Sequence, residues 1–139
     1  DNFLMLSDEQ ALTASADSTN VVDLGIDDRK IGVGEQMCVA FAVNVAADST
    51  TGDETYQFNV STGTTSALGT AMVSKTVAAA DLAADDTFMI PIDHEAAKRY
   101  IGVEYVLGGT TPSVTITADV RPVSMVSGLA NYESGYSIT

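Results

Sequence analysis

The sequence has one cysteine, Cys38, one histidine, His94, and no tryptophan. A single cysteine excludes an intrachain disulfide, so packing alone must hold the fold, as expected for assembly in a reducing cytoplasm. One cysteine and one histidine cannot supply the three or four ligands of a zinc site. A histidine-dependent serine nucleophile would also need a Gly-x-Ser-x-Gly turn, which the chain lacks. We therefore expect no catalytic residue, no metal ligand and no cofactor: Cys38 is predicted to be a small buried thiol and His94 an exposed loop residue.

Basic residues are also scarce, because six Lys and Arg stand against 19 Asp and Glu, giving a net charge of −13 and a pI of about 4.1. Such a surface repels nucleic acid and anionic lipid, so neither is an expected partner. No apolar run approaches the roughly 20 residues that span a bilayer. The expected binding partners therefore present basic or neutral polar surfaces.

The acidic residues themselves give no specific site. Asp48, Asp53 and Glu54 form one acidic loop, and Asp81, Asp85 and Asp86 form another, but neither has the spacing of a calcium-binding loop. Glu104 is predicted to point outward, where it would need a second carboxylate to act on a glycoside. Aromatic residues make up only 6 % of the chain, which leaves little for a sugar-stacking platform. The core is accordingly expected to consist of Val, Ile, Leu, Met and Ala.

Period-two alternation is the strongest positive signal in the chain. Between residues 100 and 120, two alternating stretches flank Gly108, Gly109 and Pro112. Alternation places one face of each strand in a core and the other toward water. The two glycines and the proline are typical of a reversal, so this pattern predicts a β-hairpin.

Similar alternation predicts further strands, and the small residues on one face of the stretch 37–45 suggest that an arm or a partner covers that face. The expected strands are 21–24, 37–45, 56–60, 71–77 and 88–92. The segment 61–69 is predicted to be a flexible polar loop, and 77–86 a loop with one helical turn. Seven or eight short strands with almost no helix predict an all-β protein, a single antiparallel jelly-roll-like β-sandwich.

Both ends of the chain are predicted to be arms: residues 1–20 form an N-terminal arm, 21–122 the β domain and 123–139 a C-terminal arm. Each arm carries isolated apolar side chains that something must cover, either the domain itself or a neighbouring subunit. These candidate anchors are Phe3, Leu4, Met5, Leu6, Met125, Leu129, Tyr132 and Tyr136.

Three groups of residues resemble the capsid cement (decoration) proteins of short-tailed bacteriophages. They are the opening segments 3–8, 10–16 and 18–25, the segments 51–58 and 107–115, and residues 122–125. The resemblance covers most of the domain but not residues 126–139. It implies a virion structural protein on the outer surface of the capsid, assembled in the host cytoplasm, that binds the major capsid protein. It also implies self-association, with a homodimer favoured over a homotrimer.

The function expected from this resemblance is mechanical: the protein bridges neighbouring capsomers and stabilises the head against internal DNA pressure. Large apolar anchors usually carry most of the energy of such an interface. Two alternatives stay open, a carbohydrate- or receptor-binding β-sandwich module and another phage head or tail structural subunit.

Overall fold

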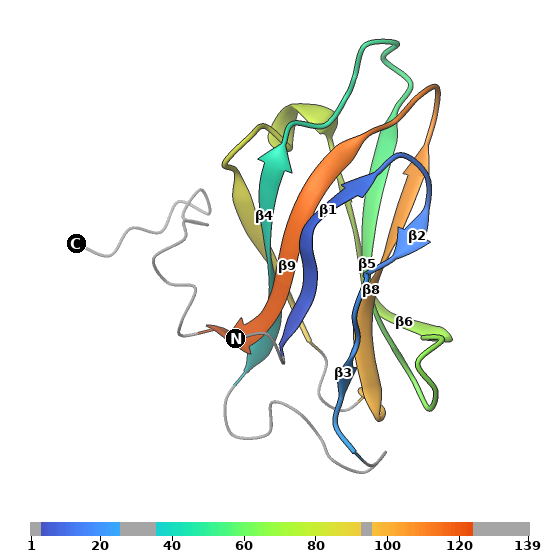
Figure 1. Cartoon of the computed structure of the whole chain (residues 1–139), viewed down its shortest axis with the longest axis vertical. Helices are drawn as coiled ribbons and strands as arrows, with labels where there is room; N and C mark the ends of the chain where they lie inside the picture. Colours follow the sequence, from blue (N-terminus) through green and yellow to red (C-terminus); the bar gives the residue numbers. More distant parts are fainter. Residues whose placement is uncertain (1–3, 26–35, 93–95, 124–139) are drawn as a thin grey trace, which may run out of the picture.

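The computed structural model describes residues 4–25, 36–92 and 96–123, which form two antiparallel sheets packed face to face (Figure 1). The first sheet has the order β1 (Met5–Leu12), β9 (Val114–Pro122), β4 (Met37–Val45) and β7 (Thr87–Pro91). The second has the order β2 (Ala16–Asp17), β8 (Tyr100–Gly108), β5 (Thr55–Gly63) and β6 (Thr70–Val77), with β3 (Val22–Asp23) also paired to β8. The predicted all-β antiparallel sandwich is confirmed.

The strand pairing is that of a long ribbon folded back on itself and rolled up. Antiparallel ladders join β1 to β9, β2 and β3 to β8, β4 to β7, and β5 to β6. Two further ladders, β4 with β9 and β5 with β8, join these strand pairs into the two sheets. This order is the jelly roll, which consists of two Greek keys.

The predicted hairpin between residues 100 and 120 is wrong, although both of its strands exist. β8 belongs to one sheet and β9 to the other, and the loop that contains Gly109 and Pro112 crosses between them. Alternation indicates that one face of each strand is buried. The same alternation is expected whether the next strand pairs in the same sheet or lies in the sheet across the core. The turn residues specify a reversal but not which sheet receives the next strand.

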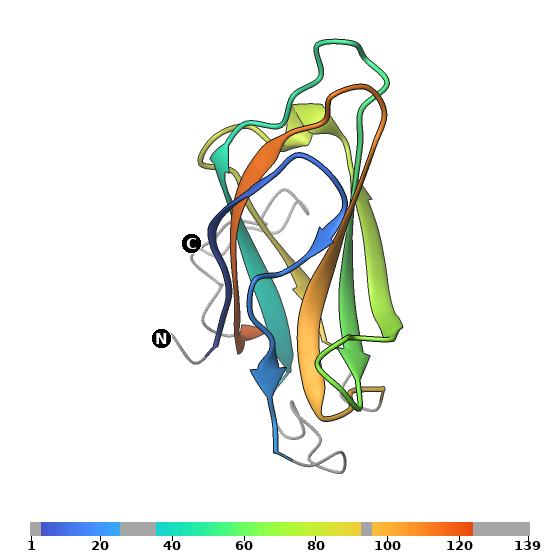
Figure 2. The same cartoon turned by 45° about the vertical axis from the view of Figure 1, so that its right-hand side comes forward.

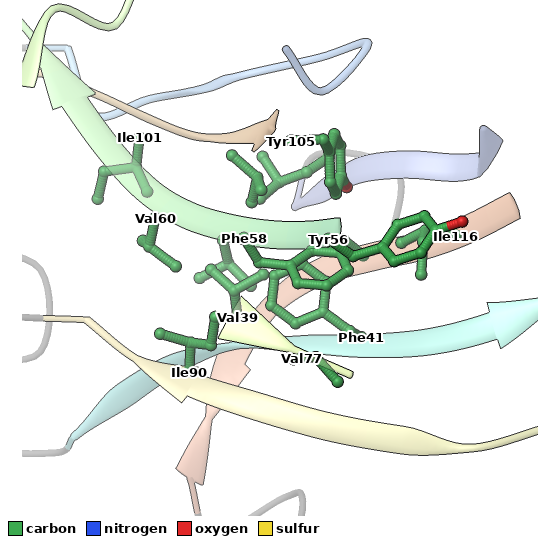
Figure 3. Packing of buried hydrophobic residues seen from close by; sticks show 14 of the residues in the cluster. Val39, Phe41, Tyr56, Phe58, Val60, Val77, Ile90, Ile101, Tyr105 and Ile116 are labelled. Carbon is green, nitrogen blue, oxygen red and sulfur yellow. The ribbon is translucent and has the colours of Figure 1, made fainter. Parts of the chain in front are cut away.

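Aromatic side chains fill the centre of the core, which corrects the expectation of a purely aliphatic interior. Tyr56, Tyr105, Phe41 and Phe58 are the four largest fully buried side chains. The rings of Phe41 and Phe58 come from opposite sheets and lie 5.4 Å apart, and Tyr105 meets Phe58 edge-on at 5.7 Å (Figure 3). Few aromatics suffice because these rings meet in the space between the two sheets. Figure 2 shows how the two sheets face each other.

In the part that the structure describes, the N-terminal segment predicted as an arm over residues 1–20 belongs to the β-sandwich, so the domain itself covers it, which is one of the two alternatives left open. β1 pairs with β9, and Leu6 is 0 % exposed in the core. Polar residues of this segment make hydrogen bonds within the fold. The Ser7 hydroxyl lies 2.8 Å from the Tyr105 hydroxyl and donates to Gln10 Oε1 at 2.6 Å. Burial raises the pKa of Tyr105, so its phenol stays protonated.

The polar segment 61–69 is also better packed than predicted. Ser61 and Thr62 are fully buried within β5, and Leu68 is 2 % exposed. A Cβ atom at Gly102 would lie 2.7 Å from Leu68 Cδ1, so the glycine leaves space for this side chain over the outer face of β8. A single apolar residue therefore holds a loop that composition alone marks as flexible.

The other secondary-structure predictions agree with the structure. The strand 37–45 coincides with β4, and the strand 71–77 lies within β6. The single helical turn is Ala79–Asp81. In the described part of the chain this is the sole helical segment, and no helix there is long and apolar enough to cross a membrane.

Cys38 is buried on the outer face of β4, as predicted. Together with Ala40 it forms a small cluster, and within the described residues Met89 and Val123 cover that cluster. Burial raises the pKa of the Cys38 thiol to about 11. The reactive thiolate is therefore suppressed in the folded protein at neutral pH.

Cys38 is accordingly expected to resist alkylation by iodoacetamide at pH 8 in the native protein and to react at the rate of a free thiol in urea. Because the folded pKa lies above that of the unfolded chain, its stabilising contribution is complete below about pH 9 and is lost as the pH rises toward 11. Mass spectrometry of the alkylated protein over time measures both rates. Rapid labelling under native conditions would contradict the burial of this thiol.

Candidate interaction site

Of the eight apolar anchors predicted from the sequence, the structure describes three. Leu6 belongs to the core and cannot contact a partner, so it is wrong as an interface residue. Leu4 and Met5 are half-buried, and Leu4 also accepts a backbone hydrogen bond from Val120 at 2.9 Å. These two stay predicted anchors. The remaining five, Phe3, Met125, Leu129, Tyr132 and Tyr136, lie outside the described residues, as does His94.

One end of the sandwich gathers acidic loops. The connections 46–54, 78–86 and 109–113 lie together at the upper end of Figure 1, because each follows a strand that runs in that direction. They contain no lysine or arginine. Their acidic residues are Asp48, Asp53, Glu54, Asp81, Asp85 and Asp86. This end therefore presents a negatively charged surface, which attracts basic partners.

Hydrogen bonds to neighbouring loop groups fix several of these carboxylates. Asp53 accepts from the Thr110 backbone N–H at 3.0 Å and from its hydroxyl at 2.9 Å, which joins the loop 46–54 to the loop 109–113. Asp48 accepts from the N–H and the hydroxyl of Thr50. In both residues the hydrogen bonds hold the carboxyl pKa below its usual value. The acidic loops are thus ordered by their own carboxylates.

No metal centre emerges from this arrangement. Within the described residues, no group of three or more His, Cys, Asp or Glu side chains is placed to hold a metal ion. Glu104 does point outward from β8, as predicted, and accepts a hydrogen bond from the Ser61 hydroxyl at 2.9 Å. That contact gives the carboxylate a structural role between β5 and β8.

The two long sides of the sandwich differ. On one side the chain passes from β1 to β2 and thereby from one sheet to the other, and Gln10 on β1 donates to the Asp17 carbonyl on β2 at 3.0 Å. On the opposite side, β7 and β6 are the edge strands of their sheets and no ladder joins them. The sandwich is therefore closed along one side and open along the other.

A groove of about 470 Å³ lies along this open side, near the acidic end. It is lined by Lys75, Thr76, Val77, Ala78, Asp81, Asp86, Thr87 and Phe88. Phe88 is half-buried, and its ring stacks on that of Phe41 with the centroids 4.7 Å apart. The groove thus combines one aromatic side chain with two carboxylates and one ammonium group.

Sequence reasoning missed this groove, although it noted some of its parts. The strands 71–77 and 88–92 were predicted, and Asp81 and Asp86 were recognised as acidic loop residues. What brings them together is the pairing of β6 with β5 and of β7 with β4, which leaves both edges on the same side. No local pattern in the sequence encodes that juxtaposition.

The strand order defines a jelly-roll domain. Its most distinctive described surface is the acidic groove, which is suited to binding another molecule. The Bbp16 family model matches residues 6–120, from β1 to β9, so the chain belongs to the Bbp16 family, a phage-related family. A search of curated proteins found no match.

Proposed function

We propose that this protein is a capsid cement protein: a virion structural protein that binds the outer surface of the shell formed by the major capsid protein. It bridges neighbouring capsomers and opposes the outward pressure of packaged DNA. The observation that carries the proposal is the family match, which spans the whole jelly-roll body and points to a phage protein. The protein acts by binding, without a catalytic step or a cofactor, and self-associates as a homodimer.

Several features of the molecule support this function. The acidic end offers charge complementarity to basic patches on a partner, which speeds and orients association. Interfaces of roughly 1,600 Å² are of standard size for stable complexes, and many copies on one shell add their affinities through avidity. The half-buried Leu4 and Met5 lie where β1 begins, next to the strand β9 that it pairs with, and supply apolar contact at that edge. Electrostatic attraction of the partner therefore acts at one end of the sandwich, and apolar contact is made at the other.

The purified protein is expected to co-sediment with empty shells assembled from the major capsid protein and to saturate them at a fixed stoichiometry. Electron cryomicroscopy of the pelleted shells should show extra density on their outer surface at bridges between capsomers. Shells of an unrelated phage serve as the control for non-specific binding of an acidic protein. Recovery of the protein in the supernatant at all concentrations, or density on the inner surface, would contradict the proposal.

A further inference from the structure

The groove between β6 and β7 opens at the acidic end of the sandwich, and this placement determines what it attracts. Asp81 and Asp86 line the groove, and both are exposed. Asp85 adjoins them, and the three loops at this end contain no lysine or arginine. A basic group on a partner therefore meets an attractive field before it reaches the groove.

The two edge strands are poor templates for adding another strand. β7 has five residues and ends at Pro91, which has no backbone N–H to donate. β6 carries Lys75 directly opposite the buried Phe58, so its side chain starts on the core-facing side of the strand. Short edges, prolines and inward-facing lysines are devices that prevent strand addition. The groove is consequently better suited to receive side chains than a whole extended strand.

Phe88 provides a planar surface for such a side chain. One face of its ring stacks on Phe41 at an interplanar angle of 13°, and the residue also lines the groove. Planar guanidinium groups stack on aromatic rings and pair with carboxylates through several N–H donors at once. Phe88, Asp81 and Asp86 together supply both kinds of contact.

Lys75 is the one basic residue in the lining of the groove. Its side chain forms no hydrogen bond or ion pair with any other residue that the structure describes. Its ammonium group repels a second cation, whereas the two carboxylates of the lining attract one. Val77 and Ala78 add apolar atoms to the lining of the groove.

We propose that this groove binds an arginine side chain, together with an adjacent apolar residue, from a loop of the capsid-shell protein. The guanidinium stacks on Phe88 and pairs with Asp81 and Asp86, and the apolar neighbour lies over Val77 and Ala78. The identity of the partner rests on the proposed function, whereas the chemistry of the groove follows from its own residues. The volume of about 470 Å³ is within the usual range for pockets that bind small molecules or side chains.

The first test is co-sedimentation with shells of the major capsid protein, using the double variant Asp81→Asn/Asp86→Asn. Asparagine keeps the size and the acceptor oxygen, so the hydrogen bond from the Ala83 N–H to Asp86 is retained. We expect binding to weaken about tenfold. The matched control, Asp8→Asn/Asp17→Asn, removes the same charge from β1 and β2 on the closed side and should change binding less than about twofold.

Replacing Lys75 by glutamate changes the charge of the groove in the opposite direction. Lys75→Glu adds a carboxylate beside the groove and should strengthen binding about threefold for a basic partner segment. Weaker binding of Lys75→Glu would show that the occupant is acidic and would overturn the proposal. Equal binding of wild type and the Asp81→Asn/Asp86→Asn variant would also overturn it, while leaving the cement function intact.

The second test examines the groove without a shell. Titrating the ¹⁵N-labelled protein with a blocked Arg-Leu dipeptide should shift the amide signals of Asp81, Asp86 and Phe88, and a blocked Glu-Leu dipeptide should not. If the wild type fails to bind shells but these shifts occur, the proposed partner is wrong and the groove chemistry stands. Absence of the shifts would refute the arginine site. Weaker self-association of the Asp81→Asn/Asp86→Asn variant than of the wild type in concentration-dependent sedimentation would also refute it, because a second copy would then occupy the groove.

Discussion

Leu6→Ala is expected to lower the free energy of unfolding by about 3 kcal/mol, because it removes a fully buried side chain from the core. The residue lies in β1, whose partner β9 also pairs with β4 in the middle of its sheet. The cavity left by the missing methyl groups cannot collapse easily there, since Tyr105 and Ser7 are held nearby by their mutual hydrogen bond. Urea denaturation followed by circular dichroism should show a lower midpoint at an unchanged slope.

Met5→Ala is the matched control for this variant. Met5 directly precedes Leu6 but is only half-buried, so its truncation should cost less than about 1 kcal/mol. A Leu6→Ala protein with the stability of the wild type would mean that the N-terminal segment does not contribute to the core. In that case the predicted arm would be restored, and Leu6 would again be available to a partner.

Gly109→Ala is expected to destabilise the protein by about 3 kcal/mol, through two effects at one position. Gly109 has φ +91°, a conformation that residues with a side chain rarely adopt. A Cβ atom there would also lie 2.3 Å from the Asp53 carbonyl oxygen and 2.7 Å from Glu54 Cα, both rigid backbone atoms. Moving them would disturb the Asp53 hydrogen bonds to Thr110 that join the two loops.

Gly52→Ala separates the conformational effect from the steric one. Gly52 has φ +86°, but an added Cβ meets nothing within 4 Å, so only strain remains and about 1 kcal/mol should be lost. Comparing the urea midpoints of the two variants isolates the close approach of the loops. Equal destabilisation would show that Gly109 does not pack against the 46–54 loop.

The N-terminal segment shows why burial was harder to predict than strand formation. Ser7 and Gln10 break the apolar pattern of β1, so the sequence indicated a polar arm. Their hydroxyl and amide groups are satisfied by Tyr105, Asp17 and each other, and such partners are distant in the chain. A polar residue is compatible with burial when its hydrogen bonds are made inside the protein, and those bonds exist only once the sheets have assembled.

The interaction surfaces were also predictable only in part. The excess of acidic residues is a property of composition, and the basic or neutral character that it predicts for a partner surface stays a prediction. The groove was not predictable, because Lys75 and Phe88 belong to different sheets and are brought together only by the order of the strands.

By itself, the sequence determined that the chain is all-β, where most of its strands lie and which face of β4, β5, β8 and β9 is buried. Those features depend on residues one or two positions apart, whose alternation and turn-forming glycines act locally. Only the tertiary structure decided that β8 and β9 enter opposite sheets, that Leu6 belongs to the core and that an open groove separates β6 from β7. The physical reason is that strand partners are selected by packing across the whole core, through contacts between residues up to about a hundred positions apart, as between Ser7 and Tyr105.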